Sequence, residues 1–412
     1  MKIFLLICWR NLWRHRRRSL IVISSVAIGI FAMMLSMGIL NGVYYQAIDN
    51  NINIALGHVS VQAKGFRDSM TLRNSFVPDG ALNRALAALG GQSKGYAPRL
   101  KMQGMLNSSE SSKGVIIVGV DPAREKNVSN IRSYISGRDG GTFLPDAESN
   151  QICISRDVAE KLDVVPGDSI VVMVQDKNDE MVGVGMTVSG LFQTPIDSIN
   201  QFTAFVGIRR LQEMTGAGDR ISEINIALKD RNRVEETKAV IARAVRSPSL
   251  AVLTWKEMAP YLVSSIMVVD AMMYVSFGII FITIIFSIAN TLIMAIMERF
   301  HEIGVMKAIG TKPSWIFSMI LFESVNLGMI GLGAGIVLSW IIIGILSRVG
   351  INFSFHFEAV RAFGSGAVIY PIMRWTDVAA GAVIVMLTTV TAALYPARKG
   401  ARIEPLEAIT FI

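Results

Sequence analysis

The stretch that decides the fold is Ser19 to Ile48, whose centre reads LIVISSVAIGIFAMMLSMGIL over residues 20–40. It runs for 30 positions without a charged residue, whereas about 20 apolar residues are enough for a helix to cross a bilayer. Five arginines lie within Arg10 to Arg18, directly before it, and the positive-inside rule places such a cluster in the cytoplasm. A cleaved signal peptide is shorter and ends in small residues. We therefore expect an uncleaved signal anchor.

The segment before this run predicts an amphipathic helix on the cytoplasmic membrane surface. Between Ile3 and Trp13, apolar residues recur at roughly helical spacing beside the arginines. A merely basic flank is the alternative.

The composition excludes several classes of protein. Of 412 residues, 51% are hydrophobic and 17% charged, which is too apolar for a wholly soluble protein. The net charge of +8 lies beside apolar runs, so it indicates membrane topology and no nucleic-acid partner. Two cysteines and four scattered histidines predict no disulfide scaffold, metal site or redox chemistry.

Three further apolar runs crowd the C-terminal third of the chain. They are Leu262 to Met297, interrupted only by Asp270; Trp315 to Ser347, interrupted only by Glu323; and Val378 to Leu394. With a cytoplasmic N-terminus, the loop at 298–313 and the tail both lie inside, and both are rich in Lys and Arg. We expect an α-helical membrane protein with four transmembrane helices and a large α+β domain between the first two.

The expected segments follow from these runs, and two of the helices are longer than a bilayer requires. The 36 residues from Leu262 to Met297 would extend about 54 Å as one helix, so this helix and the first should project as a stalk. Tilt is the alternative. The expected boundaries are an N-terminal helix at 1–18, TM1 and stalk at 19–45, the outside domain at 46–261, stalk and TM2 at 262–297, a cytoplasmic helix at 298–313, TM3 at 314–347, an outside loop at 348–375, TM4 at 376–395 and a cytoplasmic tail at 396–412.

The outside domain mixes strands and helices. β-branched and aromatic runs predict strands at 58–62, 115–120, 151–154, 169–175, 183–192, 202–208 and 221–228. Apolar periodicity predicts helices at 81–89, 156–162, 209–214 and 234–245, the second of them capped by Ser155. Pro166-Gly167 predicts a type II turn, and Asp176 to Glu180 a hairpin tip. Cys153 should be a buried packing residue, and no catalytic motif is present.

Two C-terminal segments carry a family resemblance. The inside loop reads ERFHEIGVMKAIG from Glu298 to Gly310, and the tail reads YPAR from Tyr395 to Arg398 followed by PLEAI at 405–409. These resemble the coupling segment and tail of the MacB and LolC/LolE permeases, which belong with FtsX to the mechanotransmission class of ABC transporters. The outside segments GHVSV at 57–61 and PGD at 166–168 resemble the periplasmic core of the same class. The resemblance covers essentially the whole chain.

The resemblance implies a non-catalytic permease subunit of the bacterial inner membrane, with both termini cytoplasmic and the large domain periplasmic. It implies two copies of a separate ABC ATPase that hold ATP and Mg, and a second permease, identical or homologous. Gly304 to Gly310 does not have the spacing of a Walker A loop. The coupling residues carried over are Glu298, Arg299, Glu302, Ile303, Gly304, Lys307, Ala308 and Gly310. We expect Glu298, Glu302 and Lys307 on one helix face, and an ordinary solvated loop is the alternative.

The LolC/LolE branch implies that lipoproteins are extracted from the inner membrane for a periplasmic carrier. MacB-like export of hydrophobic compounds or peptides, FtsX-like signalling to a cell-wall hydrolase and a plain membrane anchor are the alternatives. The hairpin tip at 176–180 is shorter than the LolC hairpin that catches the carrier, so carrier capture is delegated or absent. The candidate cargo-lining residues are Met33, Met34, Met37, Met267, Met272 and Met273, for which ordinary packing is the alternative.

A carboxylate and a pair of glycines in the third apolar run each support a structural prediction. Glu323 either snorkels to the cytoplasmic surface or pairs with another group inside the membrane. Gly331 and Gly335 form a small-xxx-small motif that predicts close packing against another helix.

Overall fold

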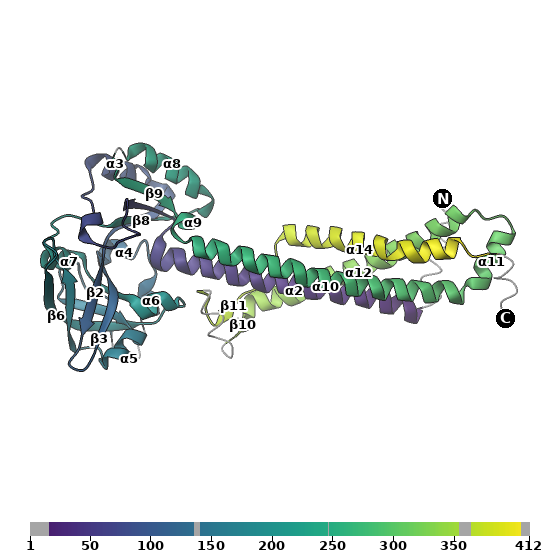
Figure 1. Ribbon diagram of the computed structural model, residues 1–412, viewed down its shortest axis with the longest axis horizontal. Helices are drawn as coiled ribbons and strands as arrows, with labels where there is room; N and C mark the ends of the chain where they lie inside the picture. The colour runs from purple at the N-terminus through teal and green to yellow at the C-terminus, as the bar shows by residue number, and fades with distance from the viewer. Residues whose placement is uncertain (1–15, 136–140, 246, 354–363, 405–412) are drawn as a thin grey trace. The chain divides into compact units, whose positions relative to one another are not determined.

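The computed structural model describes residues 16–135, 141–245, 247–353 and 364–404 (Figure 1). Its contacts divide the chain into two compact units. The helical unit comprises 1–43, 266–352 and 368–412, and the sheet unit comprises 44–265 and 353–367. The amphipathic helix expected at Ile3 to Trp13 and the tail motif at 405–409 lie outside the described residues.

In the described residues of the helical unit there are four long helices, each long and apolar enough to cross a membrane. A short helix, α11, joins the second to the third, and a two-stranded hairpin of β10 and β11 joins the third to the fourth. The predicted apolar runs are therefore confirmed as helices. Their bounds are α2 Arg16–Asn51, α10 Pro260–Glu298, α11 Phe300–Ala308, α12 Pro313–Val349, β10 Ile351–Asn352, β11 Val368–Ile369 and α14 Trp375–Ala401.

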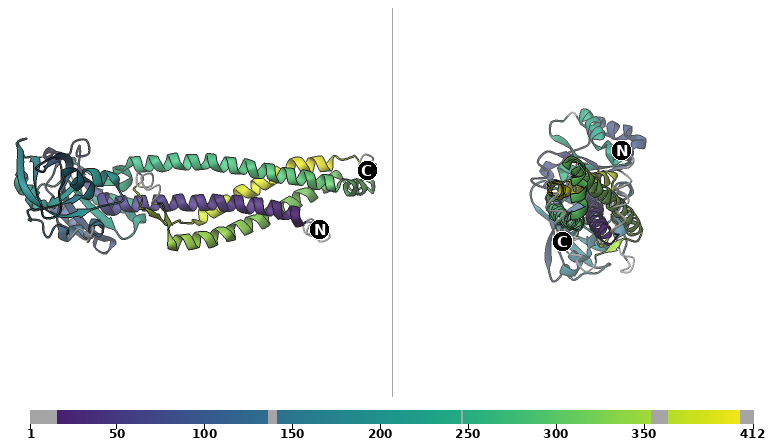
Figure 2. Two further views of the ribbon diagram at one scale, coloured as in Figure 1. Left: turned by 90° about the horizontal axis from the view of Figure 1, so that it is seen from below. Right: turned by 90° about the vertical axis from the view of Figure 1, so that its right-hand side faces the viewer.

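Neighbouring helices of this unit alternate in direction along the chain (Figure 2). The α10 helix runs antiparallel to α2, because the hydroxyl of Ser287 donates to that of Ser25 at 3.2 Å, while Ile284 packs on Gly29. The α12 helix runs antiparallel to α14, since Gly328 meets Thr389 and Ile320 meets Gly400. The loop between α10 and α12 therefore lies at the same end of the unit as the start of α2 and the end of α14.

The predicted small-residue contact of α12 is confirmed. A Cβ on Gly331 would lie 3.0 Å from the carbonyl oxygen of Ile23, and one on Gly335 would lie 2.8 Å from that of Ala27. Both partners belong to α2, so the two backbones approach too closely for any larger residue. This contact fixes the third helix against the first.

In the described part of the sheet unit, nine strands form one mixed sheet, and Figure 1 labels β2, β3, β6, β8 and β9 among them. Strands β3, β7, β4, β6, β5 and β2 pair in that order, and β2 pairs back with β3 to close a ring of six. The long strand β2 also pairs with β8, and β1 and β9 follow β8 in the same sheet. The strands are β1 Val59–Ala63, β2 Ser93–Asn107, β3 Ser112–Val120, β4 Gln151–Ser155, β5 Ser169–Gln175, β6 Met181–Phe192, β7 Thr203–Gly207, β8 Glu223–Leu228 and β9 Leu250–Thr254.

The helices of the sheet unit are short. They are α3 Gly80–Ala88, α4 Pro122–Glu125, α5 Arg156–Leu162, α6 Asp197–Phe202, α7 Ile208–Thr215, α8 Val234–Ala244 and α9 Trp255–Met258. All seven predicted strands and all four predicted helices are confirmed within a few residues, whereas β2, β9, α4, α6 and α9 were not predicted. The Ser155 hydroxyl accepts the N–H of Val158 at 3.1 Å, which confirms that cap.

The predicted turns and the buried cysteine are also confirmed. The N–H of Asp168 donates to the carbonyl of Val165 across a turn in which Gly167 has a φ of +102°, as the third residue of a type II turn requires. Cys153 is completely buried beside Phe192 and Phe205, and burial raises the pKa of its thiol to about 12. It is an inert packing residue in the folded chain.

Candidate functional site

The loop between α10 and α12 folds into a short helix with sharp breaks at both ends. The α10 helix ends at Glu298, Arg299 leaves helical geometry with φ −107° and ψ 15°, and α11 begins at Phe300. Gly310 follows α11 with a φ of +96°, which favours glycine, and Pro313 opens α12 at its first turn. The motif residues therefore set the length and exit angles of α11.

The expectation that Glu298, Glu302 and Lys307 share one helix face is wrong. Glu298 belongs to the preceding helix, because the break at Arg299 separates it from α11. The Lys307 ammonium also points away from the exposed side, toward the end of α14. Only Glu302 of the three lies on the exposed side of α11.

Arg299 anchors the start of α11 to the third helix. Its Nη1 lies 3.2 Å from Oε2 of Glu323 on α12, and its Nε lies 3.5 Å from Oε2 of Glu302. Arg299 and Glu323 are both buried, and an unpaired charge would be costly there. Of the two readings of Glu323, pairing is therefore the one the structure supports. A cavity of about 140 Å³ between Ile303, Met319 and this pair is large enough for water.

Lys307 anchors the end of α11 to the fourth helix. Its Nζ donates to the carbonyl of Ala401 at 3.2 Å and to the carbonyl of Ile403. Ala401 is the last residue of α14 and Ile403 follows shortly after it. A cation at a helix C-terminus is favourable. Ile303 and Gly304 are buried between these two anchors, where Ile303 packs on Ile316 and Ile320.

The outer face of α11 is exposed and mostly apolar. Counted from His301, the exposed residues lie one, four, seven and eight positions further along, and these spacings fall on one side of a helix. The five residues are His301, Glu302, Val305, Ala308 and Ile309. The Ile309 side chain is 79% exposed, and Trp315 at the start of α12 is 58% exposed. An exposed apolar patch beside a carboxylate, on a helix held from behind, is suited to enter a groove of another protein.

The six candidate cargo-lining methionines do not share one surface. Met33 and Met34 are buried in the helical unit. The terminal methyl carbon of each lies 3.6 Å from the position that a Cβ on Gly381 of α14 would take. Met267 and Met272 are about two-thirds exposed on α10, and Met37 and Met273 are half-buried. Packing is therefore the role of Met33 and Met34 in this structure, and a lining role for the others stays a prediction.

The hairpin tip between β5 and β6 is tied to the body of the sheet unit. The N–H of Lys177 donates to the carbonyl of Thr215 at 3.0 Å, and Arg73 forms an ion pair with Asp179. The tip therefore does not extend freely from the sheet, in agreement with its short length.

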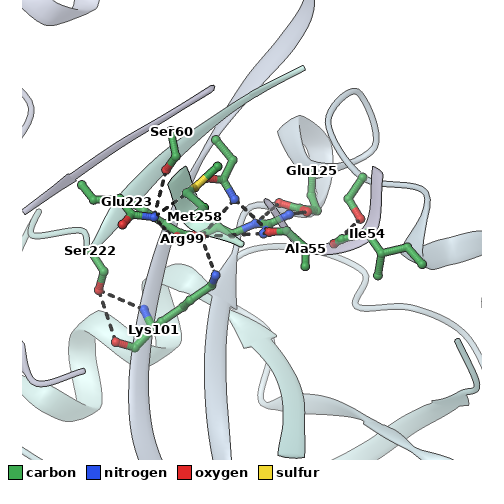
Figure 3. A network of polar contacts seen from close by, with 12 residues as sticks. Ile54, Ala55, Ser60, Arg99, Lys101, Glu125, Ser222, Glu223 and Met258 are labelled. Atoms are coloured by element: carbon green, nitrogen blue, oxygen red, sulfur yellow. Dashed lines mark hydrogen bonds and ion pairs between the residues drawn. The ribbon is translucent and has the colours of Figure 1, made fainter. Parts of the chain in front are cut away.

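A buried polar cluster holds the end of α2 in the sheet unit (Figure 3). The Arg99 guanidinium on β2 pairs with Glu125 of α4, lies 3.7 Å from Glu223 of β8, and donates to the carbonyl of Ala55. Ala55 belongs to the π-helical turn Ile52–Leu56 that continues α2. Burial alone would lower the pKa of Arg99, but the two carboxylates outweigh it and raise the pKa, so the guanidinium stays charged. The sequence did not predict this cluster, because its members come from separate elements.

His58 follows this turn and is buried as a neutral side chain. Its Nδ1 accepts the N–H of Leu228 at 3.2 Å. Burial, and then the positive charges of Lys94 and Arg231, lower its pKa from 6.5 to about 4. Neutral His58 therefore completes the junction between the end of α2 and β8.

The fold defines a class: a membrane protein of four long helices with an α+β domain inserted between the first and the second. The comparisons with known families name it. The MacB-like periplasmic core domain matches residues 19–244, which is more than half of the chain, and the FtsX-like permease C-terminal domain matches residues 274–405. The chain belongs to this family of permeases. It is a membrane protein with a periplasmic domain, and the family implies an ATPase partner and pairing of permeases.

Characterised relatives cover nearly the whole chain at low identity. The lipoprotein-releasing system transmembrane protein LolC of Xylella fastidiosa (strain 9a5c) is 22% identical over 402 residues, covering 95% of this chain and 94% of its own. LolE of Haemophilus influenzae is 20% identical over 400 residues, covering 93% and 92%. The pyoverdine export ATP-binding/permease protein PvdT of Pseudomonas syringae pv. tomato is 22% identical, covering 98% of this chain and 58% of its own.

Proposed function

We propose that the chain is a permease subunit that couples ATP hydrolysis by a separate ATPase to a conformational change of its periplasmic domain. In this proposal α11 lies in the cytoplasm and its outer face enters a groove of the ATPase. ATP and Mg belong to that partner, which supplies the chemical energy. The observation that carries the proposal is the double anchoring of α11 behind an exposed apolar face.

The anchoring explains how a push on α11 would move the membrane helices. Arg299 joins the start of α11 to Glu323 on α12, and Lys307 joins its end to the last turn of α14. A helix fixed at both ends transmits displacement as a rigid body, whereas a solvated loop would absorb it. The α2 and α10 helices contain 36 and 39 residues, more than the roughly 20 that a bilayer needs, which supports their role as a stalk.

Lipoproteins leaving the inner membrane are the proposed cargo. This assignment rests on LolC and LolE, which align with the chain over nearly their full length. Extraction of acyl chains requires energy, at about 0.8 kcal/mol for each buried CH₂ group, which explains a need for ATP. The tied hairpin tip supports delegation of carrier capture to a second permease. Export of hydrophobic compounds or peptides is the second candidate, and the likeness to PvdT, a pyoverdine export protein, favours an export role.

Ile309→Asp tests the docking surface most cleanly, because this side chain is 79% exposed and its change should leave the permease folded. The charge should weaken ATPase binding by disrupting the apolar contact. Glu160→Lys, an exposed change on α5 in the sheet unit, is the control. We expect less co-purified ATPase and less ATP-driven transport only for Ile309→Asp. Wild-type binding and transport in that variant would refute the docking surface.

The cargo has a separate test. A photo-crosslinker at Met267, which is exposed on α10, should capture a lipoprotein in the absence of ATP, and depletion of the permease should leave outer-membrane lipoproteins in the inner membrane. Unchanged lipoprotein distribution together with sensitivity to an exported compound would favour the second candidate.

A further inference from the structure

A basic groove lies where α10 and α14 end, apart from the outer face of α11. Its volume is about 1070 Å³. One part of its wall is apolar or aromatic, formed by Met297, Phe300 and Tyr395, and the other part carries Arg398, Lys399 and Arg402. The groove is therefore amphipathic, with apolar side chains on one side and cationic side chains on the other.

Among the described residues, the three cations of this groove have no carboxylate paired with them. All three are exposed. The C-terminal carbonyls of α14 would attract a cation, but Lys307 already occupies the carbonyls of Ala401 and Ile403. Three positive charges thus converge on one groove and favour an anionic ligand.

The position of the groove along the axis of α14 indicates which class of anion it would bind. The apolar run of this helix ends at Leu394, and Tyr395 directly after it is 63% exposed, as aromatic residues at a membrane interface are. Arg398 lies four residues beyond Leu394, which is about 6 Å along the helix axis. With α14 spanning a bilayer, the cations would lie at the level of the lipid headgroups, and Met297, which is 49% exposed, would border the hydrocarbon.

We propose that this groove binds an anionic phospholipid, with its phosphodiester against Arg398, Lys399 and Arg402 and the upper part of an acyl chain along Met297 and Tyr395. Basic pockets between membrane helices recognise such headgroups by charge and shape. The lipid would bridge the end of α10 to the end of α14. This binding needs no ATPase and no cargo, so it can be tested independently of the proposed function.

Native mass spectrometry of the delipidated full chain tests the proposal, with phosphatidylglycerol, phosphatidylcholine and inorganic phosphate as probes. The test variant is Arg398→Gln/Lys399→Gln/Arg402→Gln. A control removes the same number of charges elsewhere in the helical unit: Arg17→Gln/Lys312→Gln/Arg348→Gln. We expect phosphatidylglycerol to bind at least about tenfold more tightly than phosphatidylcholine, and this preference to disappear only in the test variant.

Several outcomes would overturn the proposal. Equal affinity for the two lipids, or an unchanged preference in the test variant, removes the site. Binding of inorganic phosphate as tight as that of phosphatidylglycerol makes it a free-anion site. Loss of ATPase binding in the test variant with lipid preference intact makes the groove a protein interface. If the test variant does not fold, a photoreactive phosphatidylglycerol should label wild-type peptides containing Met297 or Tyr395, and labelling elsewhere alone refutes the site.

Discussion

Replacing Arg99 with methionine should destabilise the sheet unit strongly. The change leaves Glu125, which is 1% exposed, as a buried carboxylate without its cation. Glu223 is less affected, because Lys101 Nζ lies 2.7 Å from its Oε1. The carbonyl of Ala55 also keeps a donor, because the side-chain amide of Asn225 donates to it at 3.1 Å. Breaking one buried ion pair in this way costs about 3 to 5 kcal/mol.

The completely buried thiol of Cys153 reports on this loss in the intact chain. With Cys8 replaced by serine, a thiol reagent reacts with Cys153 only when the sheet unit opens. A loss of about 3 to 5 kcal/mol should raise the labelling rate by about a hundredfold to several thousandfold. Arg99→Met/Glu125→Leu removes both charges and should recover most of the loss.

Arg124→Met is the matched control, because Arg124 lies on the same helix as Glu125 but pairs with Asp121 at the surface. Its effect should stay within about 1 kcal/mol. Labelling of Arg99→Met at the wild-type rate would show that the buried ion pair does not stabilise the sheet unit, as would a double variant no more stable than the single one.

Three further predictions concern topology, anchoring and pH. In a cysteine-free background, Asn178→Cys should react with an impermeant maleimide in spheroplasts and Lys312→Cys only after lysis; the reverse pattern would overturn the orientation. Lys307→Met should lower the melting temperature through loss of about 1 to 2 kcal/mol at the end of α14, whereas Lys312→Met should not. Because the folded pKa of His58 lies below its unfolded value, the stability it contributes is fully present above pH 6.5. It should be lost as the pH falls toward 4, by at most roughly 3 kcal/mol, and unfolding of His58→Asn should lack this pH dependence.

Hydropathy was sufficient to predict the helices of the helical unit. The local pattern of residue types was sufficient to predict most strands of the sheet. The apolar runs needed no tertiary context, because any helix of that composition enters a membrane. Strand β2 was missed because Gly95, Pro98, Arg99, Lys101 and Gly104 indicate a loop when read locally.

Contacts from distant segments make that stretch a strand. Glu125 and Glu223 neutralise its buried charges, and Gly104 is required because a Cβ there would lie 2.4 Å from Ile117 and 2.7 Å from the carbonyl of Met173. No spacing within the segment predicts such partners.

The site was located from the sequence, but its orientation was not. The motif from Glu298 to Gly310 identified the segment, and helical periodicity then placed its charges on one face. The direction of Lys307 depends on carbonyls 94 and 96 residues further along the chain, and that of Arg299 depends on Glu323. Charges that a sequence reading assigns to the partner therefore serve as internal anchors.

In the proposed coupling, motion imposed on α11 reaches the periplasmic domain. Spin labels at Asn178→Cys in the sheet unit and Thr376→Cys at the start of α14 report on it in the reconstituted complex with the ATPase. We expect ATP to shift the distance distribution between the two labels, and Ile309→Asp to abolish the shift. An identical distribution with and without ATP, or a shift that persists in Ile309→Asp, would contradict this coupling.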